Sequence, residues 1–434
     1  MRNTPPMTMN RTQLSITCIQ DGSPVTKEIQ DFFNLKNRDI RPFYNSSTGQ
    51  TVNNAGFVGI VRKGDHLLVS LPKHYMQTSN FNKLSFEDKR RHILTIMQTI
   101  TAVQNDTAYR YYSKLNDVEC DFDMDAYFGI HEYYEAYGLY HDEANTIGEG
   151  YKGKISWKDT LRKSKKIIAH NSIIYAPFYV MKKTYNENLI TRCMIFAINY
   201  VEQLFGGFIP LPDNTRIADR GVDMAILNNL PLVISKLQEA RNKIFKDIDI
   251  KLVTNLISFL QQVNDSPQNS SKSLKDYTYY SVWECAVEKF LNDHFMGIEN
   301  DHIQLSKTVL ERKNSFSKLK ESGYDLVHPS HTLEPDHYYL DRQRSIQYIF
   351  DSKYYSNLND LNHKQLVYQL LFENRAKKTF NALLIPTESG PSTSIHVLIN
   401  PSWLPKGSES TFSEMKIYLG HLNTIDVLRN LVNA

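Results

Sequence analysis

The chain has 434 residues, enough for two or three domains, and 41% of them are hydrophobic. This apolar content can build real cores and excludes long disordered stretches. The formal net charge of +3 excludes a global basic field, so any binding of nucleic acid has to use local patches.

The first 75 residues are rich in strand patterns. Two apolar runs, Phe57 to Val61 and Leu67 to Lys73, flank the polar segment Arg62 to Asp65, which predicts a β-hairpin. A helix is predicted next, over Phe86 to Asn105. Met1 to Met9 lack the apolar core of a secretion signal, so we expect no signal peptide.

The middle of the chain is predicted to be mainly helical. Helical patterns cover Tyr127 to His141, Asn188 to Phe205 and Met224 to Phe245. The apolar run Met194 to Phe205 is too short and too polar to span a bilayer, so no membrane association is expected. The polar run Asn264 to Ser273 has no periodicity and predicts a domain boundary.

One stretch imitates a phosphate-binding loop. Gly148 to Lys154 has the glycine and lysine spacing, but Ile155 stands where magnesium coordination needs Ser or Thr. The preceding residues, His141 to Ile147, are polar and poorly suited to the buried strand that such a loop follows. We therefore expect no hydrolysis of GTP or ATP by this chain itself.

The cysteines are far apart in the sequence: Cys18, Cys120, Cys193 and Cys285. None forms a Cys-x-x-Cys pair, so a zinc ribbon is unsupported. Three of them fall in predicted helices or strands, which suits reduced, buried thiols. A cytoplasmic, reducing location is therefore expected.

After the boundary, an amphipathic helix is predicted over Tyr279 to Phe295. Glu284 flanks its apolar stripe, from which it can reach toward a neighbouring sheet. The alternative is an ordinary solvated carboxylate. Glu288, one turn further on, competes for any inward role.

Two strands joined by a polar turn are predicted between Pro335 and Tyr355. Asp336 stands at the head of the first strand, and the second ends in Asp351-Ser-Lys353. Because strand side chains alternate, Asp351 and Lys353 share a face. A metal-binding carboxylate beside an ammonium can hold and activate a water, which is what metal-dependent hydrolysis of a phosphodiester needs.

Chance matches to this triplet occur elsewhere, beginning at Glu87, Asp249 and Glu414. None follows a β-rich run with a Pro-Asp turn upstream, so context singles out Asp351 to Lys353. Glu334 and Asp341 are alternatives to Asp336 as the first carboxylate.

A helix predicted over Leu361 to Phe372 follows and carries Gln365 and Tyr368. Two buried strands are predicted after it, over Phe380 to Pro386 and Ser394 to Ile399. The predicted order is therefore helix, two paired strands, helix, strand.

Histidines His328, His331 and His337 lie close to Asp336 in the sequence. No cysteine accompanies them to support zinc, and no ββα pattern supports a His-Asn-His nuclease. We expect satisfied or exposed histidines near a DNA-facing loop.

This order of elements, with Glu284, Pro335-Asp336 and Asp351-Ser-Lys353, resembles the PD-(D/E)xK nuclease superfamily. Gln365 and Tyr368 resemble the Gln/Tyr helix that follows the lysine in several of its branches. Further pieces resemble LlaJI-type restriction endonucleases: the Phe57 hairpin, Gly153 to Thr160, Asn171 to Tyr175 and Trp283-Glu284. LlaJI-type nuclease subunits are similar to McrC, the nuclease partner of a GTP-driven AAA+ DNA translocase.

The resemblance implies an α/β fold, α+β overall. Residues 274–434 would form a PD-(D/E)xK core, a mixed sheet flanked by helices. Residues 1–110 would form a strand-rich region with one helix that binds the partner, and residues 111–263 a mainly helical middle domain.

The activity implied is a Mg²⁺-dependent endonuclease for double-stranded DNA, in a restriction system with an McrB-like AAA+ GTPase. Asp336, Asp351 and the Ser352 carbonyl would hold Mg²⁺, and Lys353 would orient or deprotonate the attacking water. Glu284 would complete the ligand set or hold a second ion through water. The accessory residues are Gln365, Tyr368 and Glu288.

Local basic runs are the candidate DNA contacts, and each is also compatible with a solvated surface. They are Arg162 to Lys166, the group Lys313, Lys318 and Lys320, and Arg375 to Lys378.

Two other functions stay open. One is a non-catalytic adaptor that activates an AAA+ motor, which the complete set of Glu284, Asp336, Asp351 and Lys353 argues against. The other is a self-sufficient, site-specific restriction nuclease, which a DNA-binding module in residues 1–260 would favour; no such module is recognisable.

Overall fold

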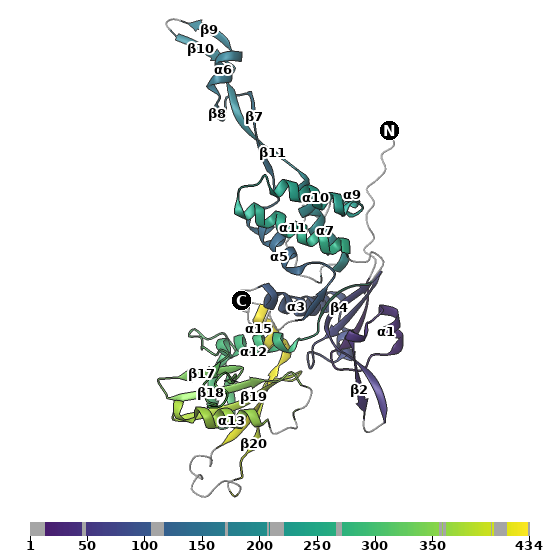
Figure 1. Ribbon diagram of the computed structural model, residues 1–434, viewed down its shortest axis with the longest axis vertical. Coiled ribbons are helices and arrows are strands. Elements are labelled where there is room, and N and C mark those ends of the chain that lie inside the picture. Colours follow the sequence, from purple (N-terminus) through teal and green to yellow (C-terminus); the bar gives the residue numbers. More distant parts are fainter. Residues whose placement is uncertain are drawn as a thin grey trace. The chain divides into compact units, whose positions relative to one another are not determined.

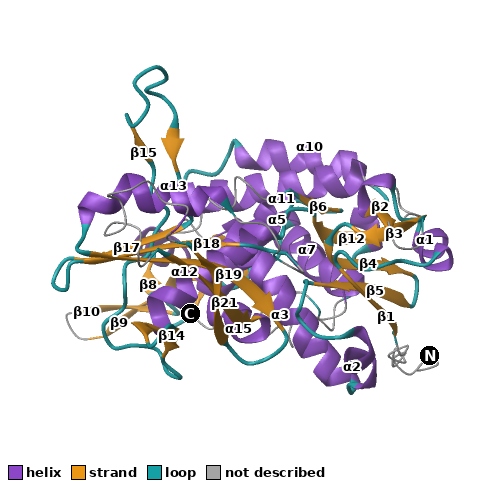
Figure 2. Ribbon diagram, turned by 90° about the horizontal axis from the view of Figure 1, so that it is seen from below, coloured by secondary structure: helices purple, strands orange, loops and turns teal. Residues whose placement is uncertain are grey.

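The computed structural model describes residues 14–45, 49–105, 117–169, 172–205, 208, 221–265, 271–355, 358, 362–400, 402 and 415–432. Helices and strands are mixed throughout, which confirms the predicted fold class (Figures 1 and 2). Contacts divide the chain into two compact units. Unit 1 is Met1–Asp121, Gly207–Pro210 and Gln268–Ala434, and unit 2 is Phe122–Gly206 and Leu211–Pro267. Unit 1 contains residues of both the predicted first domain and the predicted third domain. The division into three domains stays a prediction.

The N-terminal sheet of unit 1 is mixed, with strand order β1-β5-β4-β12-β6. Its strands are β1 (Ser15–Gln20), β4 (Val58–Lys63), β5 (His66–Leu71), β6 (Val118–Cys120) and β12 (Lys272–Asp276). β4 and β5 pair antiparallel, which confirms the predicted hairpin. β12 joins from the far side of the predicted boundary, of which residues 266–270 lie outside the described residues. A Cβ on Gly59 would collide with the Leu274 carbonyl, so glycine permits this close pairing.

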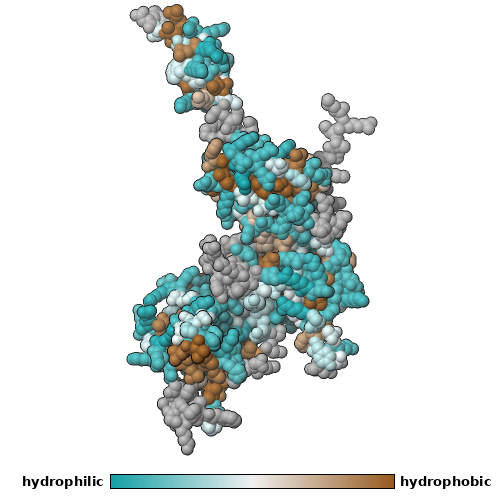
Figure 3. Space-filling view, viewed as in Figure 1, coloured by the Kyte–Doolittle hydropathy of each residue, from teal (hydrophilic) through white to brown (hydrophobic). Residues whose placement is uncertain are grey.

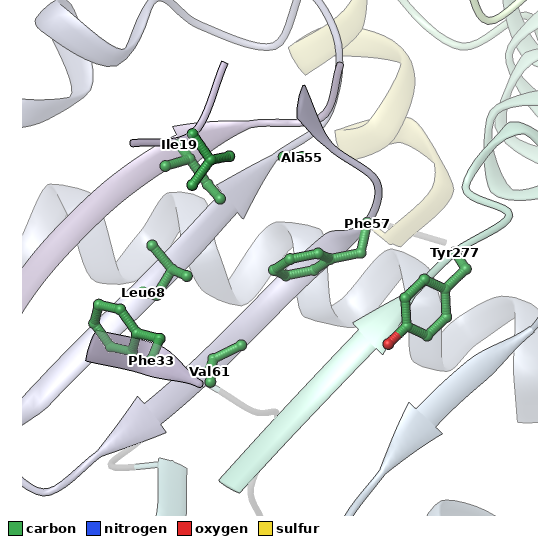
Figure 4. Packing of buried hydrophobic residues seen from close by; sticks show 8 residues of the cluster. Ile19, Phe33, Ala55, Phe57, Val61, Leu68 and Tyr277 are labelled. Atoms are coloured by element: carbon green, nitrogen blue, oxygen red, sulfur yellow. The ribbon is translucent and has the colours of Figure 1, made fainter. Parts of the chain in front are cut away.

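One face of this sheet is covered by α1 (Lys27–Phe33), the 3₁₀ helix η1 (Asn37–Asp39) and the hairpin of β2 (Ile40–Asn45) and β3 (Gln50–Ala55). Their apolar side chains form one buried cluster: Ile19, Val25, Phe33, Ala55, Phe57, Val61, Leu68 and Tyr277 (Figure 4). After β5 come α2 (Thr78–Lys83) and α3 (Phe86–Asn105), and α3 has the predicted bounds.

A second mixed sheet in unit 1 has the order β17-β18-β19-β21-β20. Its strands are β17 (His337–Asp341), β18 (Ile346–Ser352), β19 (Lys378–Thr387), β20 (Ser392–Leu398) and β21 (Lys416–Asn423). β17 and β18 pair antiparallel, which confirms the strand–turn–strand prediction, and β18, β19 and β21 run parallel. The prediction of a buried strand over Ser394 to Ile399 is wrong about burial. β20 is an edge strand, and Ile395 and Leu398 are exposed on it.

Helices flank this second sheet. They are α12 (Tyr280–His294), α13 (His363–Phe372), the 3₁₀ helix η3 (Glu373–Arg375) and α15 (Thr424–Val432). α13 packs on β18 and β19, while α12 packs on α3, α15 and β18. Two small pairs, β13 (Phe295–Glu299) with β14 (His302–Leu305) and β15 (Glu321–Ser322) with β16 (Thr332–Leu333), come between α12 and β17. Apart from these pairs, the predicted order of elements is confirmed.

Unit 2 contains a group of helices in which α11 packs on α5, α7 and α10. The helices are α5 (Met124–Tyr137), α7 (Leu189–Phe205), α9 (Met224–Leu227), α10 (Leu230–Arg241) and α11 (Asp247–Asp265). The helix predicted over Met224 to Phe245 is broken into α9 and α10. Pro231 lies in the first turn of α10 and has no N–H to continue a helix from α9.

Between α5 and α7, a ribbon of strands that we call the β-arm (residues 142–186) extends from the helices of unit 2 (Figure 1). It consists of β7 (Asp142–Glu149), β8 (Lys154–Ile155), α6 (Trp157–Lys163), β9 (Lys165–Ala169), β10 (Ser172–Ala176) and β11 (Tyr179–Asn186). The expectation that the residues before Gly148 are not a strand is wrong, because β7 pairs with β11 over its whole length. Gly148 is itself paired with Val180 in this ribbon, where a phosphate loop would instead open a helix.

None of the helices in the described residues is both long enough and apolar enough to cross a membrane.

Candidate active site

Strand β18 delivers Asp351, Ser352 and Lys353 to the end of the second sheet. Its run of Ile, Tyr, Ile and Phe favours a strand buried on both faces. Gln347 and Ile349 face α13, since the Gln347 amide donates to the Phe372 carbonyl at 2.8 Å and Ile349 packs beside Phe372. Because side chains alternate, Asp351 also lies on the side facing α13.

Asp336 stands immediately before β17 and meets Asp351. The Ser352 N–H donates to Asp336 Oδ2 at 3.1 Å, and the two carboxyl groups share a hydrogen bond. Both are buried, with 8% of Asp336 and 4% of Asp351 exposed. Burial first, then Asp351, raises the pKa of Asp336 to about 9. Burial also acts to raise the pKa of Asp351, but Asp336 and Lys353 together lower it. The titrations of the two carboxyl groups are therefore coupled, because their shared hydrogen bond raises the pKa of Asp336 and lowers that of Asp351.

Lys353 completes the triplet. Its Nζ forms an ion pair with Asp351, and its N–H donates to the Leu384 carbonyl of β19 at 2.8 Å. Burial acts to lower the pKa of Lys353, but Asp351 and Asp336 raise it above its usual value. Lys353 is therefore an ammonium in this structure.

Glu284 reaches the same place from α12. The buried stripe Trp283, Ala286 and Val287 fixes the helix, and Glu284 lies half-buried at its margin. Burial raises the pKa of Glu284 to about 7, with Lys318, Asp351 and Lys353 as its charged neighbours. The structure thus brings together Glu284, Asp336, Asp351 and Lys353, as their residue types and context predicted.

Helix α13 turns Gln365 and Tyr368 toward the sheet. Burial raises the pKa of Tyr368 to about 12, and its hydroxyl bonds to the backbone of Glu334. Gln365 is completely buried, and neither atom of its side-chain amide has a hydrogen-bond partner among the described residues. The Asn381 amide holds this turn of the helix by donating to the Gln365 carbonyl at 2.7 Å.

The alternative carboxylates have other partners. Glu334 bonds Lys320 at 3.1 Å and the Thr332 hydroxyl at 2.6 Å. Asp341 lies at the opposite end of β17 from Asp336, in the hairpin turn, where it accepts the backbone N–H of Gln343 at 3.0 Å. Glu288 is half-buried one turn beyond Glu284, and its role stays a prediction.

Lys318 is a site residue that the sequence reasoning placed only in a basic surface patch. A β-bridge between Ser317 and Tyr338 sets this segment beside β17. Lys318 Nζ thereby comes within 3.8 Å of Asp336 Oδ1. The other two lysines of that group also pair with carboxylates, Lys313 with Asp293 and Lys320 with Glu334. No local pattern signals the position of Lys318, because the bridge joins residues far apart in the chain.

The prediction that the histidines are exposed or have their hydrogen bonds satisfied is wrong for His337. It is completely buried, its Nε2 lies 2.6 Å from Ser352 Oγ, and its Nδ1 has no hydrogen-bond partner within the described ranges. Burial lowers the pKa of His337 to about 3, so the ring is neutral. His331 is exposed and contacts Asp325 at 2.9 Å.

The donor set fits Mg²⁺ held by two carboxylates. Among the described residues, no three His, Cys, Asp or Glu side chains meet in a group that could hold a metal, and the role of Glu284 as a direct ligand or through water stays a prediction. The N–H and C=O of one strand residue point to the same side, and the Ser352 N–H points at Asp336. The Ser352 carbonyl therefore points to the side on which Asp336 lies, and Mg²⁺ commonly takes one or two carboxylates and keeps several waters.

The chain has no match among curated proteins. It is 12% identical to a chain in the half-complex of a tetradecameric assembly of Thermococcus gammatolerans McrB AAA+ hexamers with bound McrC, with a TM-score of 0.38 over 96% of this chain and 99% of that one. A chain of the Thermococcus gammatolerans McrBC complex is also 12% identical, with a TM-score of 0.23 over 62% of this chain and 85% of that one. Both scores lie below the level at which a shared fold follows.

The family comparison covers far more than the site. The model of the LlaJI restriction endonucleases matches residues 57–393, from the β4 hairpin to the start of β20. This span includes Glu284, Asp336, Asp351 and Lys353. The chain therefore belongs to the LlaJI restriction endonuclease family, a family of nucleases.

Proposed function

We propose that this nuclease is a Mg²⁺-dependent endonuclease for double-stranded DNA and the nuclease subunit of a GTP-dependent restriction system of the McrBC and LlaJI kind. The observation that carries the proposal is the meeting of two buried carboxylates with Glu284 and Lys353 at the end of β18. Its biological role would be defence against foreign DNA.

Each site residue has a role in this proposal. Asp336, Asp351 and the Ser352 carbonyl would hold Mg²⁺. When bound, the ion would supply Lewis acidity toward the phosphate and lower the pKa of a coordinated water. Lys353 orients the attacking water and stabilises the negative charge that grows on the phosphorus oxygens. Water adds to phosphorus, the P–O bond to the leaving oxygen breaks, and a proton passes to that oxygen.

Two further groups support the water and the DNA. Glu284 would complete the ligand set or hold a second ion through a water molecule. The buried Gln365 amide has unused donors and an acceptor on the side of Asp351, where a water or a phosphate oxygen could satisfy them. Tyr368 holds Glu334 and so fixes the entry to β17.

The β-arm supports the proposed partner, an McrB-like AAA+ GTPase. Its terminal hairpin exposes apolar side chains on both strands (Figure 3): Ile167, Ile168, Ile173 and Ile174. Exposed apolar groups gathered at one place favour contact with another protein. The motor is a separate polypeptide in this proposal, in keeping with the paired, strand-bound Gly148 segment. None of the four cysteines, all of which lie in the described residues, forms a disulfide, which suits the cytoplasmic location proposed here.

Cleavage of plasmid DNA with Mg²⁺ tests the proposal, with wild type beside Asp351→Ala at high enzyme concentration. We expect nicking by the wild type and none by Asp351→Ala, with equal thermal unfolding of both. Lys353→Ala should lower the rate by about 100-fold or more. Asp341→Ala, a carboxylate of the same hairpin, is the matched control and should cut normally.

The same tubes separate the alternatives. Retained cleavage by Asp351→Ala would contradict the assignment of Asp351 to the active site. Cleavage that appears only after an AAA+ partner and GTP are added identifies a gated subunit, whereas sequence-specific cutting by the chain alone identifies a self-sufficient nuclease. No cleavage under either condition identifies the non-catalytic adaptor.

A further inference from the structure

Tyr354 directly follows Lys353, and its side chain enters the N-terminal part of unit 1. Its hydroxyl accepts the Lys73 N–H at 2.7 Å, and its carbonyl accepts Lys73 Nζ at 3.3 Å. The same ammonium lies 4.9 Å from the centroid of the tyrosine ring. Only 8% of Tyr354 is exposed. Lys73 therefore contacts Tyr354 at its hydroxyl, its ring and its backbone carbonyl.

A carboxylate holds the tyrosine hydroxyl as well. Asp21 is buried and accepts a hydrogen bond from Tyr354. The Asp21 N–H donates to the Leu71 carbonyl at 2.9 Å, so Asp21 is tied to the end of β5. Asp21 follows β1 and Lys73 closely follows β5, and these strands are parallel neighbours. The carboxyl ends of both strands thus converge on Tyr354.

The helix that carries Glu284 also touches this residue. The rings of Tyr354 and Tyr279 lie 5.7 Å apart, and Tyr279 is the residue before α12. The Tyr279 hydroxyl is 2.9 Å from Thr99 Oγ1 of α3. Tyr354 therefore links the strand of Lys353, the start of α12 and the N-terminal sheet.

We propose that Tyr354 is a positioning residue for Lys353, and that Asp21 and Lys73 set its position from the N-terminal sheet. The backbone of Lys353 is held by the hydrogen bond from its N–H to the Leu384 carbonyl. The next residue, Tyr354, is held by its contacts with Lys73. A change at the ends of β1 and β5 would shift the Lys353 ammonium relative to Asp351. Displacements of about 1 Å can cost about 100-fold in rate. The inference rests on the nuclease function proposed above.

Removal of the single hydroxyl tests it, because Tyr354→Phe keeps the ring between Lys73 and Tyr279. We expect kcat for Mg²⁺-dependent cleavage to fall about fivefold or more and the unfolding temperature to fall as well, because the hydroxyl loses its hydrogen bonds to both Lys73 and Asp21, with KM for DNA unchanged. Asp21→Asn keeps an acceptor and should retain the rate, whereas Asp21→Ala should match Tyr354→Phe. The double variant Tyr354→Phe with Asp21→Ala should be no slower than either single one.

A second readout does not depend on cleavage. Amine labelling followed by mass spectrometry should modify Lys353 about fivefold faster in Tyr354→Phe than in wild type, with the exposed Lys320 unchanged. Tyr280→Phe, an exposed tyrosine on α12, is the control and should alter neither readout. Unchanged labelling of Lys353 overturns the positioning role whatever the cleavage result. A wild type that never cuts, together with faster labelling, overturns the nuclease function and leaves the positioning role standing.

Discussion

Asp276, at the end of β12, is a completely buried carboxylate. Its Oδ1 accepts the Thr278 N–H at 2.7 Å, and its Oδ2 has no hydrogen-bond partner among the described residues. Burial raises the pKa of Asp276 to about 7 against the opposing bonds from Thr278, and the charge of Asp21 adds to the rise. The folded protein therefore holds this proton more tightly than the unfolded chain, in which the pKa is 3.8.

The sign of the pH dependence follows from that difference. At low pH the carboxyl group of Asp276 is protonated in both the folded and the unfolded protein, so it does not lower the free energy of unfolding. As the pH rises from about 4 to about 7, the unfolded chain ionises first and the free energy of unfolding falls. Above about pH 7 the folded form ionises too. Asp276→Asn should raise the free energy of unfolding at pH 8 by up to about 4 kcal/mol. The gain should vanish at pH 4. Urea unfolding of both proteins at the two pH values checks this, and an equal gain at both would contradict it.

At the scale of elements, β12 is anchored to η1 by a buried ion pair. Lys275 Nζ lies 2.9 Å from both oxygens of Asp39, which also accept the Tyr277 hydroxyl at 2.7 Å and the Lys36 N–H at 2.7 Å. The Asp39 side chain is wholly buried. Every strong acceptor direction of this carboxylate is thus occupied.

Lys275→Met should destabilise the protein by about 3–5 kcal/mol, because it leaves the Asp39 charge buried without its partner. The matched control is Lys36→Met. Its ammonium pairs with Glu119 at the surface, so its loss should cost less than about 1 kcal/mol. Chemical denaturation of the two variants measures both values. A Lys275→Met variant as stable as Lys36→Met would show that the pair contributes little.

Elements with a strong local pattern were predictable. α3, α7, the β4–β5 hairpin and β17–β18 each carry an apolar period that matches their burial. The β-arm was not predicted as a ribbon, because β7 is polar and its ladder with β11 needs no buried face. β12, with the sequence KSLKD, gives no strand signal, and only its distant partners β4 and β6 make it one.

The candidate site likewise contains residues that local sequence patterns predict and residues that they do not. Asp336, Asp351 and Lys353 come from one hairpin, so their meeting follows from strand geometry alone. Glu284 was placed by the margin of an apolar stripe on a single helix. Lys318 and Tyr354 depend on contacts outside this hairpin, and no spacing in the sequence encodes them.

At the scale of the whole molecule, the residues proposed to cut DNA lie in unit 1, and the β-arm proposed as a partner contact, in addition to the predicted region 1–110, lies in unit 2. Ile168, at the end of the β-arm, is 82% exposed. Ile168→Asp should leave Mg²⁺-dependent nicking by the chain alone unchanged and lower the stimulation by an AAA+ partner with GTP by about tenfold or more. Leu326→Asp, an exposed apolar residue of unit 1, is the control. Stimulation that survives Ile168→Asp would separate the hairpin from partner binding.

The chain leaves unit 1 at Asp121 and returns beside the same place. The Asp121 N–H donates to the Ser273 carbonyl at 3.3 Å, so the two ends of the long excursion through unit 2 touch. Closing a long loop costs only about 0.6 kcal/mol more for each doubling of its length. Because Asp121 and Ser273 meet within unit 1, the length of the chain that runs between them is not set by the N-terminal sheet, and it can change at little cost to the residues proposed to cut DNA.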